Sequence, residues 1–179
     1  MDCCIEIPPD TLSINEDLSS DPVNAPEPRD DPDRKCVNCR EASRAVTRKT
    51  MLLMLKPEHF DRIDNSDYRF CSDPDCRVVY FPENGGATFT TSNLRVRVGL
   101  KERIDPIPLC YCFGFDENDV REEIAETGSS TIPSRITALI KQGMCSYLAR
   151  NPSGACCLGE VNQTIKRLTS GWVLLTEFL

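Results

Sequence analysis

The sequence contains a single histidine, His59, among its 179 residues. Histidine is the side chain that most often serves as a general acid or base near neutral pH. The sequence also lacks a Ser/His/Asp or Cys/His arrangement and a glycine-rich phosphate-binding loop. We therefore predict that the chain is not an enzyme, and we interpret His59 as an ordinary surface or helix residue.

Long apolar runs and an excess of positive charge are missing as well. No apolar run approaches the roughly 20 residues that cross a bilayer, and the opening "MDCCIEIPPD" lacks the basic and apolar regions of a signal peptide. The net charge of −7 argues against binding to nucleic acid or to anionic membranes. These absences predict a cytoplasmic protein without membrane insertion and without a nucleic-acid partner.

The negative charge is concentrated at the amino terminus. Residues 1–34 contain ten Asp or Glu, two Arg, six Pro and no aromatic residue, which gives them a net charge of −8 and leaves +1 for the remainder. Such a segment cannot bury enough apolar surface to offset the entropy of ordering it. We predict that residues 1–34 form a disordered, acidic, proline-rich tail.

The remaining chain predicts an α+β fold in two subdomains. In residues 35–105 we expect β-hairpins, with strands at 67–71, at 77–82 and at 87–99, where Leu94, Val96 and Val98 alternate with polar residues. Residues 44–55 suit either a strand or a helix. The proline-containing residues 105–109, "DPIPL", are expected to be a stiff linker.

Residues 106–179 are predicted to be an all-α subdomain. Asp116 and Asp119 are typical of a helix amino terminus, and Gly128 of its end. A second helix is expected from Pro133 to Gly143 and a third over 156–175. Each subdomain has only about 70 residues, a size that often needs extra stabilisation, and metal would supply it.

Cysteine is the residue in excess, with eleven copies. In a reducing compartment, cysteines serve as metal ligands or redox thiols rather than as disulfides. The first set combines C-x2-C with C-x4-C, spacings that are typical of structural zinc sites, in which two turns bring four thiolates around one ion. We predict a closed zinc site at Cys36, Cys39, Cys71 and Cys76, in preference to free or disulfide-bonded thiols.

The second set contains five candidates for four ligand positions: Cys110, Cys112, Cys145, Cys156 and Cys157. In an extended segment the two sulfurs of "CYC" would face one point. Both "CYC" and "CC" lead into predicted helices, whose free N–H groups stabilise anions such as an iron–sulfur cluster with four thiolates. A second zinc ion is the alternative that the spacing leaves open.

The stretches "CVNC", "RFCSDPDCRVVYF", "FTTSNLRVRVGLKE", "PIPLCYCFGF" and "NPSGACCLGEV" together resemble the N-terminal domain of CopZ-type copper chaperones. That domain is related to bacterioferritin-associated ferredoxin (BFD-like) domains. The resemblance covers about residues 35–162. It implies Zn²⁺ at the first cysteine set within subdomain 35–105. It also implies a [2Fe-2S] cluster at Cys110, Cys112, Cys145 and Cys157 within a BFD-like subdomain 106–179, with Cys157 preferred to Cys156.

The function implied by the resemblance is a one-electron redox component of copper homeostasis. Reduction of Cu(II) to Cu(I) would be its accessory activity. Its partners would be redox or metal-transfer proteins such as a copper chaperone or a copper-transporting ATPase. The alternatives are a non-redox interaction module with two zinc ions, and a sensor that responds to cluster loss.

Chaperones of this type carry a further copper-binding domain with an M-x-C-x-x-C loop, and the present sequence contains no such motif. Copper transfer by a two-thiolate loop is therefore not expected within it. Cys3 and Cys4 are the remaining thiol pair, and a flexible pair of this kind would at most capture a soft ion such as Cu(I).

Overall fold

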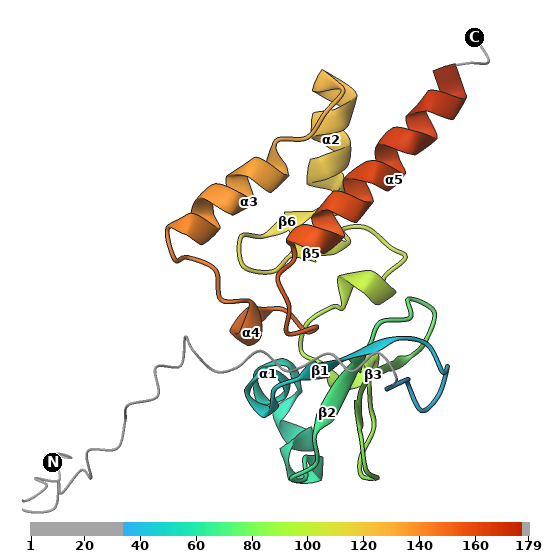
Figure 1. The fold of residues 1–179 in the computed structure, drawn as a ribbon, viewed down its shortest axis with the longest axis vertical. Coiled ribbons are helices and arrows are strands. Elements are labelled where there is room, and N and C mark those ends of the chain that lie inside the picture. Colours follow the sequence, from blue (N-terminus) through green and yellow to red (C-terminus); the bar gives the residue numbers. More distant parts are fainter. Residues whose placement is uncertain (1–33, 177–179) are drawn as a thin grey trace, which may run out of the picture.

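The fold was analysed in a computed structural model that describes residues 34–176, with side chains described to residue 170. The predicted tail, together with Cys3 and Cys4, lies outside the described residues apart from Arg34. The first part, residues 34–101, is called the sheet half here, and residues 108–176 are called the helical half. Figure 1 shows the two halves at opposite ends of the molecule, with a short hairpin and helix α4 between them.

The sheet half is built on a four-stranded antiparallel sheet with strand order β1-β2-β3-β4. Its elements in chain order are β1 (Ser43–Val46), α1 (Arg48–Met54), the 3₁₀ helix η2 (Pro57–Arg62), β2 (Tyr68–Cys71), β3 (Val78–Pro82), β4 (Phe89–Thr90), η3 (Thr91–Asn93) and η4 (Gly99–Lys101). All five residues of β3 are buried. This strand can be apolar throughout because one core lies on each of its faces.

The strands predicted at 67–71 and 77–82 are confirmed as β2 and β3. Residues 44–55 are expected to form either a strand or a helix, and they contain both: most of strand β1, followed by helix α1. The change occurs at Thr47, whose hydroxyl accepts a hydrogen bond from the Thr50 N–H at 3.1 Å and so caps the helix.

The strand predicted over 87–99 is wrong, because it ends at Thr90. The side chain of Asn93 accepts a hydrogen bond from the Thr90 N–H at 2.8 Å, which closes a 3₁₀ turn. Beyond the turn, Leu94 makes only an isolated bridge with Leu55. Leu94 and Val98 are buried in the sheet-half core, so their alternation reflects packing of an irregular segment.

The helical half contains β5 (Pro108–Cys110), β6 (Phe115–Asp116), α2 (Glu117–Thr127), α3 (Ile132–Lys141), α4 (Tyr147–Arg150) and α5 (Leu158–Thr176). The three long helices confirm the predicted ones, and both α2 and α3 pack against α5. The prediction of an all-α subdomain is wrong, because β5 and β6 form a two-stranded antiparallel sheet. The short helix α4 was not predicted.

The start of α2 follows the predicted pattern. The Asp116 carboxylate accepts hydrogen bonds from the N–H groups of Asn118 and Asp119, and Asp119 in turn accepts from the Asp116 N–H at 2.8 Å. Gly128 ends the helix at φ 77°, a left-handed conformation that glycine adopts without strain.

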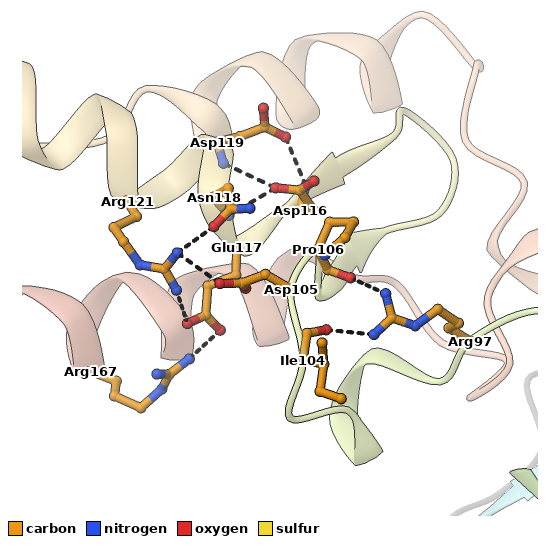
Figure 2. Close-up of polar contacts among 10 residues, drawn as sticks. All are labelled: Arg97, Ile104, Asp105, Pro106, Asp116, Glu117, Asn118, Asp119, Arg121 and Arg167. Carbon is orange, nitrogen blue, oxygen red and sulfur yellow. Dashed lines mark hydrogen bonds and ion pairs between the residues drawn. The ribbon is translucent and has the colours of Figure 1, made fainter.

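The first residue of α2 carries a buried carboxylate. Glu117 pairs with Arg121 at 3.0 Å and with Arg167 of α5 at 2.6 Å (Figure 2). Its side chain is 7% exposed, whereas both arginines reach solvent. This network ties α2 to α5 because a buried carboxylate requires charged or hydrogen-bonded partners.

The predicted linker at 105–109 is only partly a linker, since its last two residues belong to β5. The guanidinium of Arg97 bonds the carbonyls of Ile104 and Pro106, the latter at 2.6 Å (Figure 2). These bonds fasten the connecting segment to the end of the sheet half. No helix in residues 34–176 is long and apolar enough to span a membrane.

Candidate metal centres

The first cysteine set forms a cluster that can hold a metal ion. The four sulfurs of Cys36, Cys39, Cys71 and Cys76 all lie within 4.8 Å of one another. The sulfurs of Cys39 and Cys71 are 3.6 Å apart, close to the separation of about 3.8 Å that two thiolates have on one tetrahedral zinc ion. Cys36, Cys71 and Cys76 are buried and Cys39 is half-buried. Four thiolates would fill all positions of a tetrahedral zinc ion.

Two tight turns supply the ligand pairs. Cys36 and Cys39 lie on a turn closed by a hydrogen bond from the Arg40 N–H to the Cys36 carbonyl at 3.0 Å. Cys71 ends β2, and the chain then turns at Asp73, whose carboxylate accepts a hydrogen bond from the Asp75 N–H at 2.9 Å. Of the two acidic residues of "SDPD", Asp73 therefore shapes the turn, whereas the Asp75 carboxylate pairs with Arg103 at 2.6 Å.

The protonation of these thiols is set by burial and by hydrogen bonds. Burial raises the pKa of Cys39 to about 11 and also raises the pKa of Cys71. Burial acts in the same direction on Cys76, but the Asn38 amide donates to its sulfur at 3.3 Å and, with the Val78 backbone, lowers its pKa. Cys76 is thus the thiol of the cluster that loses its proton most readily among these three.

The second cysteine set is arranged as two pairs. The sulfur of Cys110 lies 2.7 Å from that of Cys157, and the sulfur of Cys112 lies 3.8 Å from that of Cys145. Within residues 34–176, no three potential ligands of this set lie within 4.8 Å of one another. The set is therefore more spread out than the first, and Cys156, which is exposed, takes part in neither pair.

The segment "CYC" does not have the predicted extended conformation. Residues 111–114 form a turn, with the Gly114 N–H bonded to the Cys110 carbonyl at 2.8 Å. For this reason the two sulfurs meet different partners. The prediction that free N–H groups of α2 face this site is also wrong, because the Asp116 carboxylate occupies the amino end of the helix.

We call the buried Cys110 and Cys157 the inner pair and the half-buried Cys112 and Cys145 the outer pair. The pKa values of the two inner thiols shift in opposite directions. Cys110 is 1% exposed and Cys157 is 2% exposed. The hydrogen bond from Cys157 lowers the pKa of Cys110 to about 7, and the same bond raises the pKa of Cys157. For the outer pair, burial raises the pKa of Cys145. Without metal, Cys110 therefore ionises before Cys157.

Comparison with known proteins identifies the first half. Residues 33–95 match the model of the zf_CopZ family, which is described as a zinc-binding domain. The chain carries a CopZ-type zinc-binding domain.

The similarity extends beyond that domain. The chain is 34% identical over 123 residues to the copper chaperone CopZ of Archaeoglobus fulgidus, covering 69% of this chain and 57% of the relative. It thus spans just over half the length of this curated relative. The X-ray structure of the CopZ N-terminal domain from Archaeoglobus fulgidus is also similar, with a TM-score of 0.60 at 30% identity. That match covers 73% of this chain and 96% of the solved domain.

Side chains that sequence reasoning missed connect the CopZ-type zinc-binding domain to the second cysteine set. The Tyr111 hydroxyl donates to the Arg97 carbonyl at 2.9 Å and accepts from the Gly99 N–H at 2.8 Å. The ammonium group of Lys101 donates to the carbonyls of Asp73 at 2.7 Å and Cys76 at 3.1 Å. The first residue of η4, Gly99, therefore holds the turn that contains Tyr111, next to Cys110. The last residue of η4, Lys101, holds the turn that ends in Cys76.

Proposed function

We propose that the chain is a one-electron redox protein of copper handling that binds one zinc ion and one [2Fe-2S] cluster. Zinc would be held by Cys36, Cys39, Cys71 and Cys76. The cluster would be held by Cys110, Cys112, Cys145 and Cys157. The copper context comes from the similarity to copper chaperone CopZ.

The observation that carries the proposal is the division of the second set into two cysteine pairs. A single zinc ion needs four sulfurs close to one another. Four sulfurs that all lie within 4.8 Å of one another are present in the first set and absent among the described residues of the second. Two pairs suit a cluster with two irons, because each iron takes two thiolates. The donor set thus fits this group, and it disfavours the alternative of a module with two zinc ions.

Each pair has a distinct environment that suits the proposed role. Cys110 and Cys157 belong to the core of the helical half, with Val120, Ile132 and Val161. Cys112 and Cys145 are half-buried, so that side of the site lies nearer to solvent and to a partner. When bound, the cluster would supply one electron, enough to reduce one Cu(II) to Cu(I).

The chain's own residues would then orient the group and limit water access at the inner pair. The Arg150 guanidinium donates to the Cys112 carbonyl at 3.2 Å, which fixes the outer rim. We infer that the partners are redox or metal-transfer proteins in the cytoplasm and that catalysis of a substrate reaction is not the main role.

The proposal is tested by anaerobic reconstitution with iron and sulfide. We expect a reddish protein whose visible absorption bleaches on reduction by one electron and which then gives an EPR signal. Mixing the reduced protein with Cu(II) should yield one Cu(I) per chain, detected with a Cu(I)-specific chelator. A protein that stays colourless after reconstitution would contradict the redox role.

A further inference from the structure

The loop over residues 147–154 connects the two sides of the second cysteine set. It follows Cys145 and precedes Cys157, so its position determines where these two sulfurs lie relative to Cys110 and Cys112. The loop lies against the sheet half rather than in solvent, and its helix α4 packs against α1 (Figure 1).

Two buried hydroxyl groups of the sheet half hold this loop. The Thr50 hydroxyl of α1 donates to the Leu148 carbonyl at 2.7 Å, and the Tyr80 hydroxyl of β3 donates to the Pro152 carbonyl at 2.7 Å. Both side chains are 0% exposed. Burial keeps the phenol of Tyr80 protonated by raising its pKa, so it remains a donor.

The loop is stiff enough to transmit its position to the cysteines. The Asn151 amide donates to the Ala155 carbonyl at 2.8 Å, and its oxygen accepts from the N–H and the hydroxyl of Ser153, each at 3.0 Å. Asn151 and Ser153 are both buried. Gly154 lies so close to α1 that a Cβ there would contact Thr50 Oγ1 at 3.6 Å.

We propose that Thr50 and Tyr80 are positioning residues for the Cys145 and Cys157 side of the cluster site, so that the zinc-binding half is a structural part of that site. This inference rests on the proposed function. The loss is costlier at Pro152, which is buried, than at Leu148, which is half-buried, because a buried carbonyl left without its donor cannot reach water. Without these hydroxyls, the loop should move away more often and expose the cluster.

The test uses the full chain with zinc and cluster loaded. Thr50→Val and Tyr80→Phe each remove one hydroxyl and keep most of the side-chain volume. Tyr68→Phe is the matched control. Tyr68 is buried in the same core, and among the described residues its hydroxyl has no hydrogen bond to the helical half. Thr50→Ser restores the hydroxyl and should rescue the first variant.

We expect an iron chelator to bleach Thr50→Val and Tyr80→Phe about tenfold faster than the wild type. Their visible circular dichroism and EPR spectra should shift, with zinc content unchanged. Tyr68→Phe and Thr50→Ser should behave as the wild type. A purely structural role would lower the melting temperature and leave the cluster spectra unchanged, which would overturn the inference.

The remaining outcomes are also decisive. Equal bleaching rates in Tyr80→Phe and Tyr68→Phe, with a wild type that loads iron, would reject the positioning role and leave the proposed function standing. A wild type that binds no iron and sulfide would reject the proposed function and the inference together. If Tyr80→Phe loses zinc, the bleaching rates of Thr50→Val and Thr50→Ser are compared instead. Faster bleaching of Thr50→Val supports the positioning role, and equal rates reject it.

Discussion

Replacing Gly99 by alanine should disrupt the contact between η4 and β5 and destabilise the protein. Gly99 opens η4 and packs against β5. A Cβ at this position would lie 1.8 Å from the carbonyl oxygen of Pro108 and 2.9 Å from its carbonyl carbon. Real Cβ atoms essentially never approach closer than 3.0 Å, so the oxygen must move by at least 1.2 Å, the difference between 3.0 and 1.8 Å.

The cost follows from what the movement breaks. Overpacking typically costs about 1–3 kcal/mol, and backbone atoms relax less readily than side chains do. The shift also disturbs the hydrogen bond from the Gly99 N–H to the Tyr111 hydroxyl, which adds about 1 kcal/mol. We expect Gly99→Ala to lower the free energy of unfolding by about 2–4 kcal/mol, a large part of a typical total of about 5–15 kcal/mol.

Urea unfolding of the zinc-loaded protein, followed by far-ultraviolet circular dichroism, measures this loss. Gly159→Ala is the control, because Gly159 lies in α5 with nothing within 4 Å of an added Cβ. Because Gly159 lies in the first turn of α5 and not in the helix interior, that substitution should change the free energy of unfolding by no more than about 0.5 kcal/mol. Equal stability of Gly99→Ala and the wild type would refute the close contact between η4 and β5.

Three further predictions concern single residues and pH. Cys157→Ser should abolish the visible absorption of reconstituted protein while Cys156→Ser keeps it, and the reverse pattern would show that the fourth ligand is misassigned. Glu117→Gln should lower the free energy of unfolding by about 1–2 kcal/mol in a denaturant titration, because Arg121 and Arg167 then lose the negatively charged carboxylate with which they pair. An unchanged midpoint would contradict this. Burial raises the pKa of Cys39 to about 11 and also that of Cys71, so both are protonated in the metal-free protein near neutral pH. Zinc must displace at least these two protons, and its apparent affinity should therefore fall at least about 100-fold for each unit that the pH drops. A competition assay with a chelator between pH 6 and 8 measures this slope, and a flat profile would contradict it.

The first cysteine set could be predicted from the sequence because its geometry is local. C-x2-C and C-x4-C each place two thiols on one turn, and the pairing of β1 with β2, which sets Ser43 opposite Cys71, brings the later turn close to the earlier one. The features that needed the structure are tertiary. Nothing in "CYC" indicates that Cys110 pairs with Cys157 and Cys112 with Cys145.

The strand wrongly predicted at 87–99 shows the limit of periodicity. Leu94 and Val98 cover the sheet-half core without joining the sheet. The residues "TTSN" contained the signal for the turn, since the Asn93 side chain bonds the backbone of Thr90. The supporting hydroxyls of Thr50 and Tyr80 gave no such local signal, because their partners lie 98 and 72 residues away.

Metal and sulfide analysis of freshly purified, oxygen-free protein tests the central claim most directly. We predict one zinc, two irons and two acid-labile sulfides per chain. Two zinc ions with neither iron nor sulfide, in material that also fails to take up both on reconstitution, would contradict it.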